Sequence, residues 1–502
     1  MDTKATIENE KDMEKNKEEK GKPHPLLRMQ DCMLDDQLQN RKINVHNLTR
    51  LYRYEKSKLN IEKFLTCFNK VVRHHPAYLT VLHQNDDGSY VQIYRPELFK
   101  DIKLEKMEEK KFQEEVLPKI LTNFQDNLFD SLLINFRLIE TEMYVYQLMD
   151  HHHVFFDGYS IKLLMDNLAK LYQDQPIIED MYYLRLKELE DMKQGEDYNK
   201  MIKYMDDVYN LKQPCGCPKK DTDLDIKKKG LDFYKFKIPK LKEKLLPIFK
   251  EDDKLYNNLI VLASMLAIAK HSGKKDIMVT WSYHGRDSLK TKYIAGNLVR
   301  LYPVRIEFKD KMKISDINEE ITKQSKYLLK KPYYPHILYS EDGEIMNDIY
   351  QKDFNKIGDF CGIKRVSVPT PPRNLDDGIF TNQVIDACYN MTEEGLEIEW
   401  QYPFNRYKRE TMKSFRDLFI KYCDKLAEHW KDNNEIDLMA LIEDNYKAQE
   451  EKEKDNKVET TDNNDKECKA SNSATKEVKL LNRKSNRDKD EDEDKGDDKK
   501  NK

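Results

Sequence analysis

The chain has 502 residues, of which 38% are hydrophobic, and its 88 basic and 92 acidic residues give a formal net charge of −4. This length and apolar content suffice for about two or three folded units, which excludes a chain that is disordered throughout. Because positive and negative residues are balanced and interleaved, neither a nucleic acid nor an anionic membrane is expected as the main partner.

Both ends of the chain are predicted to be disordered tails. Residues 1–22 and 448–502 are dominated by Lys, Glu, Asp and Asn, and such segments cannot bury enough apolar surface to offset chain entropy. The N-terminus has charged residues where a secretory signal would have an apolar core, and the apolar run from Leu259 to Ala269 is too short to cross a bilayer. A cytoplasmic location without a membrane is therefore expected.

Between these ends, helical and strand-like patterns alternate in two sets. The first set is predicted as a helix at 61–74, strands at 78–82, 90–94, 132–139 and 143–150, a helix at 160–172 and a charged helical stretch at 181–210. The second set is predicted as a helix at 255–271, strands at 276–282 and 296–308, and a helix at 404–430. We therefore expect two α/β lobes, over residues 23–215 and 216–447, with a ligand cleft between them.

The eight cysteines form no disulfide framework, and only Cys215 and Cys217 lie close together in the sequence. Their C-x-C pattern stands in the segment QPCGCPKK, bounded by Pro and Gly, and no second ligand pair follows at zinc-site spacing. An exposed loop is therefore predicted for this segment, and no metal site.

The junction between the strand at 143–150 and the next helix carries His151, His152, His153, Asp157 and Gly158. Alternation along a strand puts His151 and His153 on one side and His152 on the other. Since an imidazole titrates near neutral pH, His153 is our candidate for a base in a cleft. Asp157 could orient the loop, and Gly158 allows close backbone approach. The alternative is a purely structural histidine cluster.

The segment from His152 to Gly158 reads H-H-x-x-x-D-G and resembles the signature of the condensation domains of nonribosomal peptide synthetases. Three further segments resemble that family in the same order. Residues 71–82 are similar to its "RH..LRT" segment, residues 257–287 to its apolar helix and strand ending in Gly-Arg, and residues 296–306 to its "G.FVNTLPLR" strand. The ordered matches cover nearly all of residues 24–445.

This resemblance implies two chloramphenicol acetyltransferase-like lobes in a V, with the active site in the channel between them. It implies direct transfer of an acyl group, held as a thioester on the phosphopantetheine of a donor carrier protein, to an amine or less often a hydroxyl of an acceptor. His153 would be the base or positioner, with His152, Asp157 and Gly158 completing the catalytic motif. Asp157 would pair with Arg286, and such a pair adds orientation as well as energy.

Some positions depart from the family pattern. The Asn of the "FVNTLP" strand is Arg300 here, and the N-terminal "LSPAQ.R.W" segment is matched only weakly by residues 25–34. Arg300, Ser282 and His284 are candidates for lining the substrate channel. The sequence contains no adenylation domain and no Gly-Ser-Leu carrier motif, so a stand-alone enzyme that takes its substrates from partners is expected. A monomer is also expected. Carrier proteins and adenylation proteins would then act in trans, and no cofactor would be bound directly.

Three alternatives stay open. The sister epimerisation domain uses a Glu in "EGHGRE", and the corresponding residue here is Ser282, a poor base at neutral pH. A coenzyme A-dependent acyltransferase on the same fold would need no carrier protein. A non-catalytic module that docks carrier proteins would retain the histidines without turnover.

Overall fold

The computed structural model describes residues 3–39, 46–210, 215–228, 230–250, 252–286, 288, 291–330, 345–351, 358–371, 383–430 and 437–443. The tail predicted at 448–502 lies outside these residues. Within the described part of the chain, no helix is long and apolar enough to span a membrane.

The elements of the first half are α1 (Thr3–Glu19), β1 (His24–Pro25), α2 (Arg28–Gln39), β2 (Asn47–Glu55), α3 (Ile61–His74), β3 (Thr80–Gln84), β4 (Tyr90–Tyr94), β5 (Leu104–Lys106), α4 (Glu109–Lys111), β6 (Ile134–Glu140), β7 (Tyr144–His152), α5 (Gly158–Tyr172), α6 (Tyr182–Lys193) and α7 (Glu196–Met205). Those of the second half are β8 (Leu231–Pro239), α8 (Leu241–Phe249), α9 (Asp253–Ser272), β9 (Asp276–Tyr283), β10 (Arg300–Glu307), α10 (Ile314–Leu329), β11 (Ile345–Gln351), β12 (Arg365–Ser367), β13 (Gln383–Thr392), β14 (Gly395–Pro403), α11 (Arg409–His429) and α12 (Leu438–Glu443). The predicted helix at 61–74 is confirmed residue for residue.

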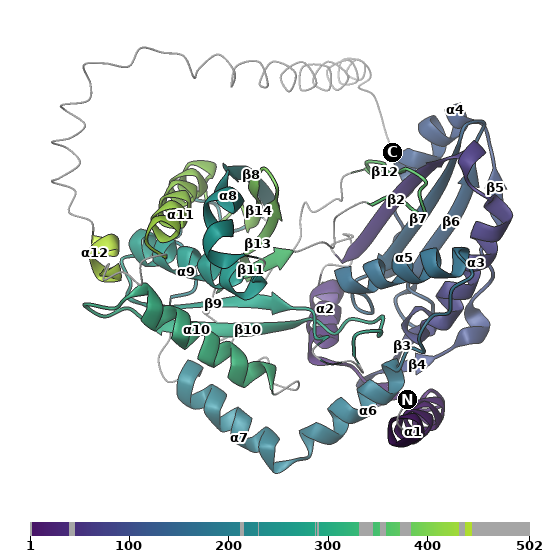
Figure 1. The fold of residues 1–502 in the computed structure, drawn as a ribbon, viewed down its shortest axis with the longest axis horizontal. Coiled ribbons are helices and arrows are strands. Elements are labelled where there is room, and N and C mark those ends of the chain that lie inside the picture. Colours follow the sequence, from purple (N-terminus) through teal and green to yellow (C-terminus); the bar gives the residue numbers. More distant parts are fainter. Residues whose placement is uncertain are drawn as a thin grey trace, which may run out of the picture. The chain divides into compact units, whose positions relative to one another are not determined.

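The first half is built on a five-stranded sheet in the order β12-β2-β7-β6-β5, with α3 and α5 packed together beside it (Figure 1). The apolar stripe of α3 is buried, as its spacing requires, and Asn60 caps the helix by accepting a hydrogen bond from Lys63 N at 3.0 Å. The central strand β7 is bonded to β2 and β6 on its two sides. The residues at its end are therefore held rigidly.

The second half is built on a six-stranded sheet in the order β10-β9-β11-β13-β14-β8. Its core includes apolar residues of α9, α10 and α11 together with one face of the strands. The strand β11 runs parallel to both of its neighbours, β9 and β13, whereas β9 and β10 are antiparallel. The two sheets confirm the predicted α/β fold class of two lobes.

Some segments from the second half of the sequence pack with the first half of the fold. The short strand β12 comes from the second half of the sequence but pairs with β2 of the first sheet. Ile294, Ala295 and Leu298 likewise belong to the apolar core of the first half. The chain passes from the first core to the second between Leu186 and Met201, which is upstream of the boundary predicted at 215/216. Apolar periodicity within each segment could not show which core the segment joins.

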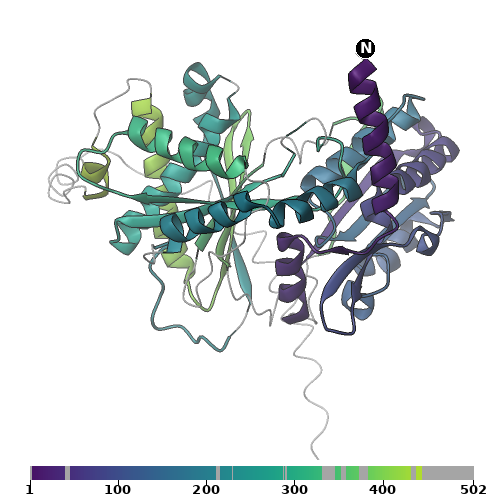
Figure 2. The ribbon, with the colours of Figure 1, turned by 90° about the horizontal axis from the view of Figure 1, so that it is seen from below.

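The N-terminus differs from the predicted disordered segment at 1–22, because residues 3–19 form α1 (Figure 2). Asn16, which is 1% exposed, donates to the carbonyl of Asp180 at 3.1 Å and accepts from Leu184 N at 3.0 Å. These long-range hydrogen bonds satisfy backbone groups at the start of α6. The charged composition of residues 1–22 does not indicate that these hydrogen bonds form.

The C-x-C segment is also not the exposed loop that was predicted. Cys215 and Cys217 are both half-buried. Cys215 N donates to Asp276 O at 2.8 Å, and Met278 N donates to Cys215 O at 2.9 Å, so Cys215 forms a bridge beside β9. The backbone pairing of this segment explains its burial without a metal.

Candidate active site at the end of β7

The histidine run lies where β7 ends and α5 begins. His151 and His152 are the last residues of β7, and His153 is the first residue beyond it. Asp157 is the N-cap of α5: its Oδ1 accepts from Ser160 N at 2.8 Å, while Asp157 N donates to Ser160 Oγ at 3.4 Å. This capping box fixes both ends of the turn that carries the motif.

His151 is a core residue. Its ring is buried against the rings of Tyr78, Phe136 and Phe156, and both of its ring nitrogens lie without a hydrogen-bond partner. Burial, and then the positive charges of Arg50 and His153, hold the pKa of His151 well below its ordinary value. His151 is therefore neutral and packs as an aromatic ring.

His152 is also fully buried, but both of its nitrogens are engaged. Val154 N donates to His152 Nδ1 at 3.2 Å, which assigns the ring proton to Nε2, and Nε2 lies 3.2 Å from Gln37 Oε1. Burial, and then the charge of His46, hold the pKa of His152 well below its ordinary value. This neutral ring links β7 to α2 and has no free nitrogen to offer a substrate.

His153 differs from His151 and His152 because it is only half-buried. Its backbone N–H donates to His46 O at 2.7 Å, and its carbonyl accepts from Asn297 Nδ2 at 2.8 Å. His46 is itself held by Asp36, whose Oδ2 lies 2.9 Å from His46 Nε2. Segments from both halves of the sequence therefore fix the backbone that carries this imidazole.

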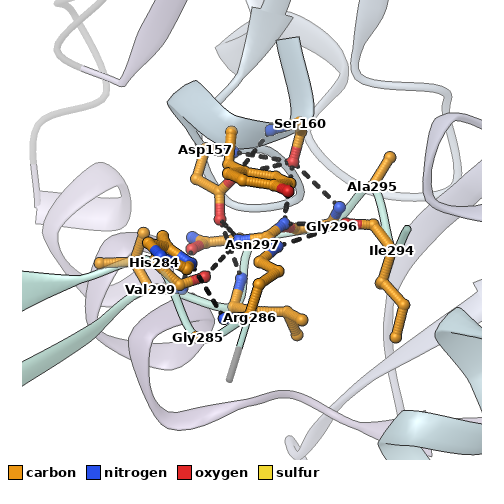
Figure 3. A network of polar contacts seen from close by, with 12 residues as sticks. Asp157, Ser160, His284, Gly285, Arg286, Ile294, Ala295, Gly296, Asn297 and Val299 are labelled. Atoms are coloured by element: carbon orange, nitrogen blue, oxygen red, sulfur yellow. Dashed lines mark hydrogen bonds and ion pairs between the residues drawn. The ribbon is translucent and has the colours of Figure 1, made fainter. Parts of the chain in front are cut away.

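The Asp157–Arg286 pair that the family resemblance implies is present. The side chains are 2% and 1% exposed, and Arg286 donates to Asp157 Oδ2. Its Nη2 donates to Gly296 O at 2.6 Å and to Ile294 O at 3.0 Å, and its Nε donates to Ile294 O at 3.3 Å (Figure 3). The guanidinium also lies over the Tyr159 ring, 4.9 Å from its centroid. One buried cation thus ties the motif to the segment that follows β9.

The segment from Ile294 to Leu298 is attached to the motif through its backbone. Gly296 N donates to Ser160 Oγ at 3.0 Å, and Leu298 N donates to Asp157 Oδ2 at 3.2 Å. A side chain at Gly296 would collide with Tyr182, because an added Cβ would lie 2.5 Å from that ring. The chain therefore approaches the motif closely only because glycine stands at this position.

A family model described as the condensation domain matches residues 22–352. The chain belongs to the condensation-domain family. Among curated proteins it is similar to bacitracin synthase 1 of Bacillus licheniformis, with 21% identity over 432 residues, which is 76% of this chain and 8% of that protein. The condensation domain described here thus spans a small part of that much longer relative.

Solved structures show the same fold. The first condensation domain of the calcium-dependent antibiotic synthetase, in complex with a substrate analogue, aligns with a TM-score of 0.61 and 14% identity, covering 83% of this chain and 99% of that one. The epimerization domain from the third module of tyrocidine synthetase B aligns with a TM-score of 0.63 and 17% identity, covering 81% and 97%. At these identities the likeness concerns the fold alone.

The three channel candidates of the condensation domain lie in different surroundings. The His284 ring stacks on Tyr159 at a centroid distance of 5.3 Å, and His284 Nδ1 accepts from Arg286 N at 3.0 Å, so it belongs to the network around Arg286. Arg300 donates to Tyr302 Oη at 2.9 Å. Ser282 donates to Asn347 Oδ1 at 3.3 Å and faces a polar group on the sheet.

Several residues of the site were missed by the sequence analysis, among them Asn297, Ser160, His46 and Gln37. Asn297 stands inside the quoted 296–306 segment, but its bond to His153 joins residues 144 positions apart and leaves no local pattern. Gln37 and Asp36 belong to α2, which was matched only weakly. Within the described residues no group of three or more His, Cys, Asp or Glu could hold a metal ion.

Proposed function

We propose that this condensation domain transfers an acyl or aminoacyl group from a carrier-bound thioester to an amine and so forms an amide. An ester formed with a hydroxyl acceptor is the less favoured product. The observation that supports the proposal is the placement of His153. It is the half-buried histidine of the run, and its backbone is fixed by His46 from the first half and Asn297 from the second.

In the proposed reaction the amine nitrogen attacks the thioester carbonyl carbon, the C–N bond forms and the C–S bond breaks. The nitrogen loses a proton, and the sulfur leaves as a thiol. His153 positions the amine and accepts its proton, and no covalent enzyme intermediate is needed. Holding both reactants in one site is itself a large part of the rate enhancement.

The remaining motif residues are proposed to position His153 or the substrate. His152 links β7 to α2 through Gln37, and Asp157 joins the α5 cap to Arg286. Gly158 is exposed in the first turn of α5 and leaves room for a close approach of the thioester. Donor and acceptor would both arrive on phosphopantetheine arms of carrier proteins supplied in trans, after loading by adenylation proteins.

The test uses the full chain with acyl pantetheine thioesters as donors and aminoacyl pantetheine amides as acceptors. The expected result is an amide product in mass spectrometry together with one released thiol per amide. The same donors on coenzyme A and on a separate carrier protein are run in parallel. Faster transfer from the carrier supports the proposal, faster transfer from coenzyme A favours the coenzyme A-dependent alternative, and no transfer from any donor leaves only a docking role.

Epimerisation is the second candidate, since the fold also matches an epimerization domain with a TM-score of 0.63. The hydroxyl of Ser282 stands where that reaction would require a carboxylate, and it is engaged with Asn347. Incorporation of deuterium at the α-carbon of a carrier-bound aminoacyl group, without amide formation, would favour epimerisation over condensation.

A further inference from the structure

The helix α1 precedes the part of the chain that the condensation-domain model matches, which begins at residue 22. It packs against α6 (Figure 1). The N-cap position of α6 is Met181, whose thioether is at most a weak hydrogen-bond acceptor. Asn16 of α1 supplies the polar groups instead: its Oδ1 accepts from Leu184 N at 3.0 Å, and its Nδ2 donates to Asp180 O at 3.1 Å. A residue that is distant in the sequence therefore caps α6.

Asp180 connects this cap to the candidate active site. Its buried carboxylate accepts from Ala295 N at 2.9 Å through Oδ2, and the same oxygen lies 2.6 Å from His75 Nδ1. Two residues beyond Ala295, the side chain of Asn297 donates to the carbonyl of His153 at 2.8 Å. A line of direct hydrogen bonds and nearby residues thus runs from α1 to the backbone that carries the candidate base.

The helix α1 is held in this place by polar contacts. Over residues 10–20 the one apolar side chain is Met13, and it is 37% exposed. The residues of this range that are buried or half-buried lie on one stripe of the helix. They are Asp12, Asn16, Glu19 and Lys20. Lys20 pairs with Glu179 at 3.5 Å, and these side chains are 22% and 36% exposed. Because this stripe buries no apolar side chain and salt screens its ion pair, we expect docking of α1 to be reversible.

We propose that Asn16 is a positioning residue for the transfer reaction and that docking of α1 regulates the candidate active site. When α1 is docked, Asn16 holds Asp180 and, through it, the segment from Ile294 to Leu298, so that His153 is fixed for transfer. When α1 undocks, Leu184 N and Asp180 O lose their partner and the segment is held less firmly. The inference rests on the proposed function and adds a second, less active state to it.

The hydrogen bonds of Asn16 affect where the reacting groups lie and not which groups react. A small misplacement of a catalytic group is costly in rate, because attack requires the reacting atoms to be aligned. Binding of the acceptor does not depend on this alignment. Loss of the Asn16 contacts should therefore lower kcat and leave the KM for the acceptor unchanged.

The test compares the full-length wild type with Asn16→Leu, Glu179→Gln and Lys15→Gln. The first variant removes both hydrogen bonds of Asn16, and the second removes the ion pair with Lys20. Lys15 is the matched control, because it is the neighbour of Asn16 on α1 and is exposed. Docking is measured by hydrogen exchange of the Leu184 amide, followed by mass spectrometry. Amide formation from pantetheine thioesters is measured between about 0.01 M and 1 M sodium chloride.

We expect Asn16→Leu to speed exchange at Leu184 and to lower kcat about tenfold, a size typical of coupling between sites. Its acceptor KM and its midpoint of global unfolding should not change. Glu179→Gln should show a smaller decrease in kcat, and Lys15→Gln should behave as wild type. In the wild type, kcat should fall with salt as exchange at Leu184 rises, and Asn16→Leu should lose most of this salt dependence. A cap that only stabilises α6 would not connect kcat to exchange in this way.

If Asn16→Leu speeds exchange at Leu184 but keeps the wild-type kcat at every salt concentration, the inference is overturned while the proposed function stands. A wild-type kcat that stays constant while salt speeds the exchange overturns it without any variant. Exchange at Leu184 that neither salt nor Asn16→Leu changes also overturns it, because α1 would then not dock reversibly. If the wild type forms no amide from any donor, the proposed function is overturned as well.

Discussion

Replacing Asp157 with Asn tests whether the buried Asp157–Arg286 pair holds the motif in place. The two side chains are 2% and 1% exposed, so the substitution would leave the Arg286 guanidinium buried with no carboxylate. Asn is as good an N-cap as Asp, so the α5 cap should survive the change. The measured decrease in the free energy of unfolding therefore reports the loss of the ion pair and its hydrogen bonds rather than the loss of the helix cap.

Breaking a buried ion pair by removing one partner costs about 3–5 kcal/mol. The matched control is Asp276→Asn, which breaks the pair that Asp276 makes with Arg305 at 2.7 Å. Those side chains are 23% and 13% exposed. Water can solvate the charge that remains when this second pair is broken. The loss of this pair should therefore lower the free energy of unfolding by about 1 kcal/mol or less. The structure therefore predicts a difference of about 2–4 kcal/mol between two chemically identical substitutions.

The assay is equilibrium unfolding in urea followed by tryptophan fluorescence, combined with the rate of amide formation. Asp157→Asn should lose activity under conditions in which it is still folded, while Asp276→Asn should retain it. The double variant Asp157→Asn with Arg286→Leu should lose less than the sum of the single variants, because it leaves no unpaired charge. Equal costs for Asp157→Asn and Asp276→Asn, or additive costs in the double variant, would refute the reasoning.

Three other predictions concern stability. Gly296→Ala should cost about 1–3 kcal/mol in urea unfolding, since a Cβ would lie 2.5 Å from the Tyr182 ring, whereas Gly358→Ala meets nothing within 4 Å and should be neutral; equal effects would contradict the close approach. Burial raises the pKa of Asp348 to about 8, so the folded protein keeps a proton that the unfolded chain loses above about pH 4, and stability is lost as the pH rises from about 4 to about 8. Asp348→Asn should therefore gain up to about 4 kcal/mol at pH 7, and a gain that does not change with pH would argue against this origin. Burial holds the pKa of His151 well below its ordinary value, so stability should fall as the pH drops below about 6.5. His151→Phe should reduce that fall in thermal melts, and an unchanged slope would show that another group titrates.

The parts of the fold that were predicted correctly are those with a strong local period. The apolar stripe of α3 predicted both ends of that helix correctly. The elements β7 and α5 were located to within a few residues because their buried faces repeat at strand and helix spacing. The strand predicted to start at 296 begins at Arg300 instead. The residues before it enter the first core, and local periodicity contains no information on which core a segment joins.

The candidate site was predictable only where a motif was contiguous. The segment from His152 to Gly158 could be located from the sequence, and the pairing of Asp157 with Arg286 came from the family resemblance. The separate surroundings of the three histidines could not be predicted, since they depend on Gln37, His46 and Asn297, which are distant in sequence.

The most direct test of the central claim is the single-turnover rate of amide formation by His153→Ala. A positioned base contributes about 10²–10⁴-fold to a rate, so the variant should be slower by at least about 100-fold, with its unfolding midpoint unchanged. His83→Ala is the control, because His83 pairs with Asp130 in an exposed position. A His153→Ala variant that forms the amide as fast as wild type would contradict the account, since the imidazole directly after β7 would then take no part in the transfer.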